Sequence, residues 1–144
     1  MAPFVVTQES PLVPADAWAR LTDWRRHGEF VPLTKVRLET APPTGVGTVF
    51  TARTAVGRLG FDDPMEVVAW SPPAHGSGGS CRLEKRGRVM LGWAELSVQP
   101  DGPGSIVTWR EDAVPAKLPA FATGVATLSG RLLFSRVMNG LLTR

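Results

Sequence analysis

Residues 18–32 read WARLTDWRRHGEFVP, and this stretch does most to decide the fold. Trp18 and Leu21 lie three residues apart, as the buried residues of a short amphipathic helix do. Gly28 breaks that helix, and Phe30-Val31-Pro32 closes a second short turn before a strand. The helix ends at an Asp-Trp pair and a basic turn, which together contain no catalytic motif. The segment instead indicates one wall of a closed ligand pocket.

The sequence on both sides of this stretch predicts β-strands. Phe4–Glu9 is short, apolar and β-branched, which suits a first strand, and Pro14 fits the first turn of the helix. Six more strands are predicted after the short helices, at residues 35–40, 48–54, 59–70, 81–85, 89–99 and 105–112. Asp62-Asp63-Pro64 interrupts or bends the third of these six, and a proline there favours an edge or a bulge.

A long helix is predicted over residues 118–142. One of its faces carries a stripe at spacings of four, three and four, formed by Phe121, Val125, Leu128 and Leu132. Runs of antiparallel strands with helices at the ends of the chain are typical of the α+β class. A curved antiparallel sheet of about seven strands must cover its apolar face, and only this helix is long enough to do so. If the sheet wraps around the helix, a cavity between them follows.

Composition predicts a soluble, cytoplasmic protein with one domain over residues 1–144. The net charge is only +3, and the cationic residues are scattered, so nucleic acid is not an expected partner. The single cysteine, Cys81, excludes an internal disulfide. No run approaches the roughly 20 apolar residues of a membrane span. A monomer or a homodimer is expected.

One local cluster of basic residues stands out: Arg82, Lys85, Arg86 and Arg88. It spans one predicted strand and the turn that leads to the next, and it is interpreted as the tip of a β-hairpin, where charge keeps an exposed turn in water.

Several motifs resemble those of one superfamily. They are Val13–Trp18 with Leu21 and Asp23, Phe30–Pro32, Val67–Pro73, Leu96–Pro100 with Gly102 and Gly104, and Val107–Glu111. With these residues the chain resembles the START-like (SRPBCC) superfamily of polyketide cyclases, dehydrases and lipid-transport proteins over nearly its whole length. The resemblance implies the helix-grip fold and a hydrophobic cavity that holds a lipid, polyketide, sterol or hormone. Its motifs are packing and turn residues, so they specify the fold more closely than the activity.

The sequence offers few groups for catalysis or metal binding. It contains no tyrosine, so no phenol is present to polarise a ketone as in a well-marked cyclase. His27 and His75 are far apart on predicted turns, and no zinc-type spacing occurs. No metal and no cofactor are therefore expected.

Glu111 is the candidate catalytic residue. It shares one face of its predicted strand with Val107 and Trp109. If that face looks inward, desolvation raises the pKa of the carboxyl group, which then suits a general base. The alternative is a strand-end residue paired with an arginine. Asp62 and Asp63 are interpreted as turn formers rather than a catalytic pair.

Ligand-binding candidates are the large apolar residues on the predicted sheet and long helix, together with one arginine that could bind a ligand carboxylate. They are Phe50, Phe61, Met65, Trp93, Trp109, Phe121, Val125, Leu128 and Arg53. Plain core packing must account for most of the apolar ones. Glycines at 124, 130 and 140 in the long helix either allow close helix–sheet packing or make room for a ligand.

Three functions remain open. The first is binding of a small hydrophobic or amphipathic molecule between the sheet and the C-terminal helix. The second is an aromatase-like polyketide cyclase or dehydrase, with an acid–base pair drawn from Glu111, Arg53 and Asp62. The third is a protein-interaction module that uses the hairpin of Arg82–Arg88 to contact an acidic partner.

Overall fold

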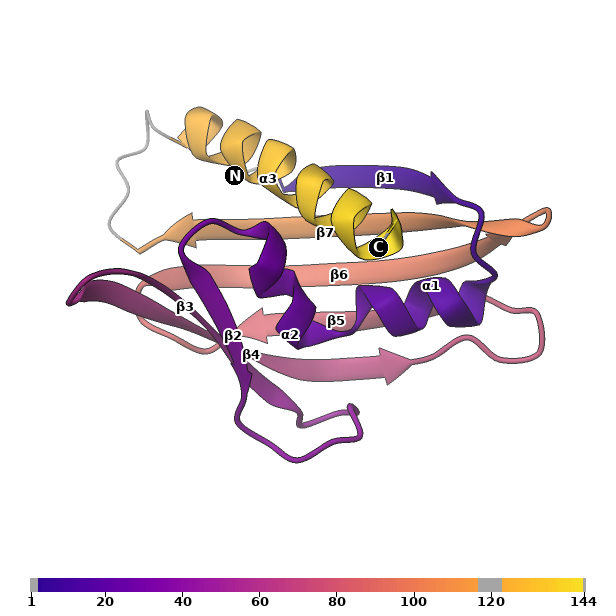
Figure 1. Cartoon of the computed structure of the whole chain (residues 1–144), viewed down its shortest axis with the longest axis horizontal. Coiled ribbons are helices and arrows are strands. Elements are labelled where there is room, and N and C mark those ends of the chain that lie inside the picture. Colours follow the sequence, from indigo (N-terminus) through magenta and orange to yellow (C-terminus); the bar gives the residue numbers. More distant parts are fainter. Residues whose placement is uncertain (1–2, 117–122, 144) are drawn as a thin grey trace.

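Seven antiparallel strands form one curled sheet, and the helices lie over one of its faces (Figure 1). The computed structural model describes residues 3–116 and 123–143, without the side chains of residues 123–129. The elements are β1 (Phe4–Ser10), α1 (Pro14–Leu21), α2 (Trp24–His27), a 3-10 turn η1 (Gly28–Phe30), β2 (Thr34–Leu38), β3 (Val49–Val56), β4 (Leu59–Ser71), β5 (Gly79–Lys85), β6 (Met90–Asp101), β7 (Gly104–Pro115) and α3 (Thr123–Thr143). The predicted helix-grip architecture is confirmed.

The strand order is β1-β7-β6-β5-β4-β3-β2. Strands β2 to β7 follow one another as neighbours, and β1 pairs with β7, so that Phe4 faces Glu111 and Ser10 faces Ser105. The two edge strands, β1 and β2, are consecutive in sequence. The chain therefore passes from one edge of the sheet to the other through α1 and α2, which brings these helices across the concave face (Figure 1).

Alternation along the strands builds the core. In β6, Ala94, Leu96 and Val98 are buried and the residues between them are not, which is the period of two expected for a sheet with one covered face. In β7, Val107, Trp109 and Glu111 are buried on one face, as the sequence predicted.

Aromatic contacts fasten the short helices to the sheet. Trp18 of α1 packs against Trp70 of β4 with ring centroids 5.0 Å apart. Trp24 of α2 stacks on Phe50 of β3 at 4.5 Å, with the two ring planes only 9° apart. Pro14 occupies the first turn of α1 as predicted. The stretch that decides the fold thus covers one end of the concave face.

Helix α3 packs on β1 and β7 through its C-terminal half, where Val137, Met138, Leu141 and Leu142 are buried. A Cβ on Gly130 would lie 2.8 Å from the ring of Phe4, and one on Gly140 would collide with the ring of Phe30. Both glycines therefore permit close packing of the helix, which is one of the two explanations considered from the sequence.

The predicted apolar stripe of the long helix is only partly described, and one of its members is misplaced. Phe121 and the side chains of Val125 and Leu128 lie outside the described residues. Leu132 is 64% exposed, which corrects its assignment to the buried face. The stripe continues into the polar positions Arg136 and Asn139, whereas the buried face continues from Val137 through Met138 to Leu141.

Asp62, Asp63 and Pro64 lie inside β4 and form no turn, contrary to the prediction for the two aspartates. Pairing of β4 with β5 ends at Met65, so Pro64 lies in a stretch paired with β3 alone, where a proline removes no hydrogen bond to β5. In residues 3–116 and 123–143, no helix is long and apolar enough to span a membrane.

Candidate functional site

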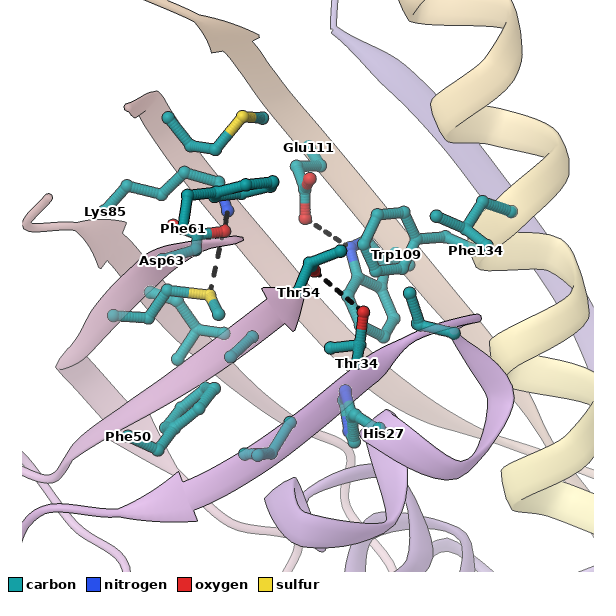
Figure 2. Close-up of a pocket in the computed structure, with 18 residues that line it drawn as sticks. His27, Thr34, Phe50, Thr54, Phe61, Asp63, Lys85, Trp109, Glu111 and Phe134 are labelled. Carbon is teal, nitrogen blue, oxygen red and sulfur yellow. Dashed lines mark hydrogen bonds and ion pairs between the residues drawn. The ribbon is translucent and has the colours of Figure 1, made fainter. Parts of the chain in front are cut away.

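A cavity of about 180 Å³ lies between the concave face of the sheet, the α2–η1 segment and α3 (Figure 2). Alternate residues of neighbouring strands face it, because side chains on one face of a strand recur every second residue. The lining residues are His27, Gly28, Val31, Thr34, Val36, Phe50, Ala52, Thr54, Phe61, Asp63, Met65, Leu83, Lys85, Met90, Trp109, Glu111, Leu133 and Phe134.

Most of the wall is apolar. Phe50, Phe61, Trp109 and Phe134 supply aromatic faces, and Trp109 packs against Phe134 with ring centroids 4.6 Å apart. An apolar wall of this kind gives affinity for hydrophobic molecules, while a few polar groups fix their orientation.

A buried ion pair lies at one end of the cavity. The Lys85 Nζ donates to Asp63 Oδ2 at 2.6 Å, and the side chains of the two residues are 5% and 13% exposed. Lys85 follows Cys81 and Leu83 on the inward face of β5, and Asp63 lies between Phe61 and Met65 on the inward face of β4. The two charges cancel within the protein.

Glu111 lies near this pair and is 4% exposed. Trp109 Nε1 donates to Glu111 Oε1 at 3.2 Å. Burial raises the pKa of the Glu111 carboxyl group, and the charge of Lys85 and the Trp109 hydrogen bond partly oppose that rise. The predicted burial and its effect on the pKa are therefore found. Among the described residues no arginine pairs with Glu111, which answers the alternative raised from the sequence.

His27 contributes a neutral imidazole to the opposite end of the cavity. Its Nε2 donates to the Leu21 carbonyl oxygen at 2.7 Å, and its ring lies against Trp24 and Trp109 at 5.4 and 5.3 Å. Burial lowers the pKa of His27 from 6.5 to about 4. The ring is therefore uncharged at neutral pH, with its proton on Nε2 and a lone pair on Nδ1.

Two threonines bond each other in the wall between these ends. The Thr34 hydroxyl group donates to the Pro32 carbonyl oxygen at 3.0 Å. The Thr54 hydroxyl group must then donate to Thr34 Oγ1, 2.8 Å away, because Thr34 has only one proton to give.

Most of the predicted site residues that the structure describes lie together in the cavity wall. Phe50, Phe61, Met65, Trp109 and Glu111 all line the cavity.

Trp93 and Arg53 lie elsewhere. Trp93 is on the outer face of β6, where the Arg82 guanidinium group covers its ring at 4.7 Å, because the inward positions of β6 have the opposite parity. Arg53 pairs with Asp62 at 3.1 Å on the surface, where its guanidinium group holds the pKa of Asp62 below its usual range. The acid–base set of Glu111, Arg53 and Asp62 is therefore not assembled in one place.

Sequence reasoning missed His27, Asp63 and Lys85 as cavity residues. The sequence predicts Lys85 at an exposed hairpin tip, but its side chain lines the cavity and pairs with Asp63. The rest of that basic cluster is largely neutralised, because Arg82 pairs with Glu95 and Arg86 pairs with Glu66 and Glu84. Alternation with Leu83 on one strand and with Phe61 and Met65 on the other was the available signal for Lys85 and Asp63.

Within the described part of the chain, no three His, Cys, Asp or Glu side chains lie close enough together to hold a metal ion.

Many solved structures have this fold, at low sequence identity to this chain. The STAR-related lipid transfer protein from Xanthomonas axonopodis matches with a TM-score of 0.67 and 17% identity, over 96% of this chain and 85% of that one. XoxI from Bacillus cereus matches with a TM-score of 0.64 and 14% identity, over 99% and 94%. Ara h 8.0201 matches with a TM-score of 0.63 and 12% identity, over 99% and 98%. These likenesses show the fold.

A search of curated proteins finds no match. The family model described as polyketide cyclase / dehydrase and lipid transport matches residues 1–141, which is nearly the whole chain. With the seven-stranded sheet and its C-terminal helix, this match shows that the chain belongs to the polyketide cyclase/dehydrase and lipid transport family.

Proposed function

We propose that this protein binds a small hydrophobic or amphipathic molecule, lipid-like or polyketide-like, in the cavity between the sheet and α3. The observation that carries the proposal is the cavity itself, with its aromatic and aliphatic wall and its few buried polar groups. Its volume of about 180 Å³ is larger than the roughly 150 Å³ of an engineered cavity that binds benzene. The family description, which names lipid transport, supports the same function.

Filling the cavity tests the proposal. Ala52 lines the cavity from β3, so Ala52→Leu places an isobutyl group where the ligand would lie. Propylbenzene, titrated by isothermal calorimetry, should bind the natural protein and bind Ala52→Leu at least about tenfold more weakly, a loss of about 1.4 kcal/mol. The variant should be as stable as the natural protein or more so, because each added CH₂ buried in empty space contributes up to about 0.8 kcal/mol.

Ala69→Leu is the matched control, because Ala69 is exposed on the neighbouring strand β4 and does not line this cavity. It should bind propylbenzene as the natural protein does. Equal binding by both variants, or no binding by the natural protein, would refute the proposal.

A second candidate function is a polyketide cyclase or dehydrase acting in the same cavity. The observation in its favour is Glu111, a buried carboxyl group with a raised pKa whose charge interacts with that of Lys85. Glu111 would accept a proton from the substrate carbon, and Lys85 would hydrogen-bond the ketone oxygen that gains charge. Glu111→Gln should then abolish turnover of a polyketone and leave its binding nearly intact. Retained turnover would remove Glu111 from the mechanism.

A further inference from the structure

The hydrogen-bond donors in the cavity wall are mostly used by acceptors of the protein itself. His27 donates its only ring proton to the Leu21 carbonyl oxygen, and Thr34 donates its hydroxyl proton to the Pro32 carbonyl oxygen. Thr54 donates its hydroxyl proton to Thr34, and Trp109 donates its indole proton to Glu111. Four groups that could have donated to a ligand therefore donate to the protein instead.

What these groups leave for a ligand is mainly lone pairs. In the described residues, only Trp24 Nε1 and Asp63 Oδ1 are side-chain polar atoms that are both buried and without a partner. Trp24 does not line the cavity, so its N–H is not offered to a ligand there, whereas Asp63 does line it and Oδ1 can only accept while the carboxylate is ionised. His27 Nδ1 and the second carboxyl oxygen of Glu111 have no hydrogen-bond partner in the described residues either, and both residues line the cavity. Lys85 is the exception, because one of its three N–H groups remains after its contacts with Asp63 Oδ2 and Met65 Sδ.

The charged groups in the cavity also favour a ligand that donates hydrogen bonds. Lys85 forms its ion pair with Asp63 at 2.6 Å, and Glu111 has no ion pair of its own; the charge of Lys85 offsets the effect of burial on Glu111 only in part. In Figure 2 this carboxyl group lies between Phe61 and Trp109 and points into the cavity. A ligand carboxylate at this place would meet the Glu111 carboxyl group, which repels it.

We infer that the ligand of this cavity carries a hydrogen-bond-donating head group, best a protonated amine, and that the cavity rejects carboxylates of the same size. The inference rests on the function proposed above, since it describes how the same cavity chooses among apolar molecules. An ammonium group can donate to Glu111 while its aryl or alkyl part fills the apolar wall. Such a cation also favours the ionised carboxyl group, which offsets the burial that raises the pKa of Glu111.

Four small compounds that share a phenyl ring and differ in their head group test this preference. Phenethylamine, phenethyl alcohol, phenylacetate and propylbenzene are titrated at neutral pH by calorimetry. Phenethylamine should bind about tenfold or more tightly than phenylacetate, because a hydrogen bond to a charged group is worth that much. Phenethyl alcohol, a neutral donor, should fall between them.

Glu111→Gln removes the charge and keeps the shape. It should weaken phenethylamine about tenfold and leave propylbenzene unchanged. Glu95→Gln, on the outer face of β6 where Glu95 pairs with Arg82, is the control and should leave both affinities unchanged.

The possible failures are distinguishable. If propylbenzene does not bind the natural protein, the proposed function fails and this inference fails with it. If propylbenzene binds but phenylacetate binds as tightly as phenethylamine, this inference alone is overturned, and that comparison does not depend on the folding of any variant. An unchanged affinity of folded Glu111→Gln for phenethylamine overturns it as well.

Discussion

His27 should make the protein lose stability as the pH falls from neutral to about 4. Burial lowers the pKa of His27 in the folded chain to about 4, against 6.5 for a free histidine. The folded state therefore resists protonation while the unfolded state accepts a proton. The stability that the neutral ring contributes is fully present above about pH 6.5 and is lost as the pH falls towards the folded pKa.

The size of the loss follows from the two pKa values. A difference of about 2.5 pKa units, at about 1.4 kcal/mol for each unit, sets an upper limit of about 3 kcal/mol. About 2 kcal/mol of this should be gone by pH 5, because the unfolded histidine is then almost fully protonated. That is a large share of the 5–15 kcal/mol by which folded proteins of ordinary size are stable.

Urea unfolding at a series of pH values measures the effect. His27→Gln is the informative variant, because its amide can still donate to the Leu21 carbonyl group but does not titrate. The difference in unfolding free energy between the natural protein and this variant should shrink by about 3 kcal/mol between pH 7.5 and 4. The subtraction removes the contribution of Glu111, which has the opposite sign because its raised pKa favours the folded state at low pH.

The other histidine supplies the control. His75 is exposed in the segment between β4 and β5, and His75→Gln should keep the pH profile of the natural protein. A difference between the natural protein and His27→Gln that stays constant across the range would refute the argument that the ring is held neutral by burial.

Two further predictions concern buried contacts. Lys85→Met should cost about 3–5 kcal/mol in urea unfolding, because it leaves the Asp63 carboxylate buried without a partner. Adding Asp63→Leu to that variant should recover most of the loss, and a double variant as unstable as the single one would contradict this. Gly130→Ala should lower stability by about 1 kcal/mol, since overpacking against the Phe4 ring, at about 1–3 kcal/mol, exceeds the gain of about 1 kcal/mol in helix propensity. A higher melting temperature for this variant would show that the ring moves aside freely.

Local pattern was enough to predict most of the fold. The strands and short helices could be placed because their periodicities are strong and because turns rich in glycine and proline separate them. Glu111 could be placed on the inward face because Val107 and Trp109 share its parity along one unbroken strand. The same rule applied to β6 would have turned Trp93 outward, since Leu96 and Val98 define the inward parity there.

The polar part of the cavity could not be predicted in the same way. The pairing of Lys85 with Asp63 depends on the register between β4 and β5, which places Met65 opposite Lys85 across a long connection. A lysine near a predicted hairpin tip is ordinarily solvated, and the parity that Lys85 shares with Leu83, which places it on the inward face, does not by itself reveal its partner. His27 was assigned to a turn, although its spacing of three from Trp24 already placed the two on one face of a helical turn.

The pairing of the first strand with the last sets the order in which this molecule can be completed during synthesis. Phe4 meets Glu111 across the sheet, so the edge strand must wait until more than a hundred further residues have left the ribosome. At about 5–20 residues per second this delay is on the order of 5–20 seconds. The strands from β2 to β7 can pair with their neighbours as they emerge, whereas β1 has no strand to pair with until β7 exists. The nascent chain therefore cannot close its cavity before β7 has been made, and any binding in that cavity must follow the synthesis of β7.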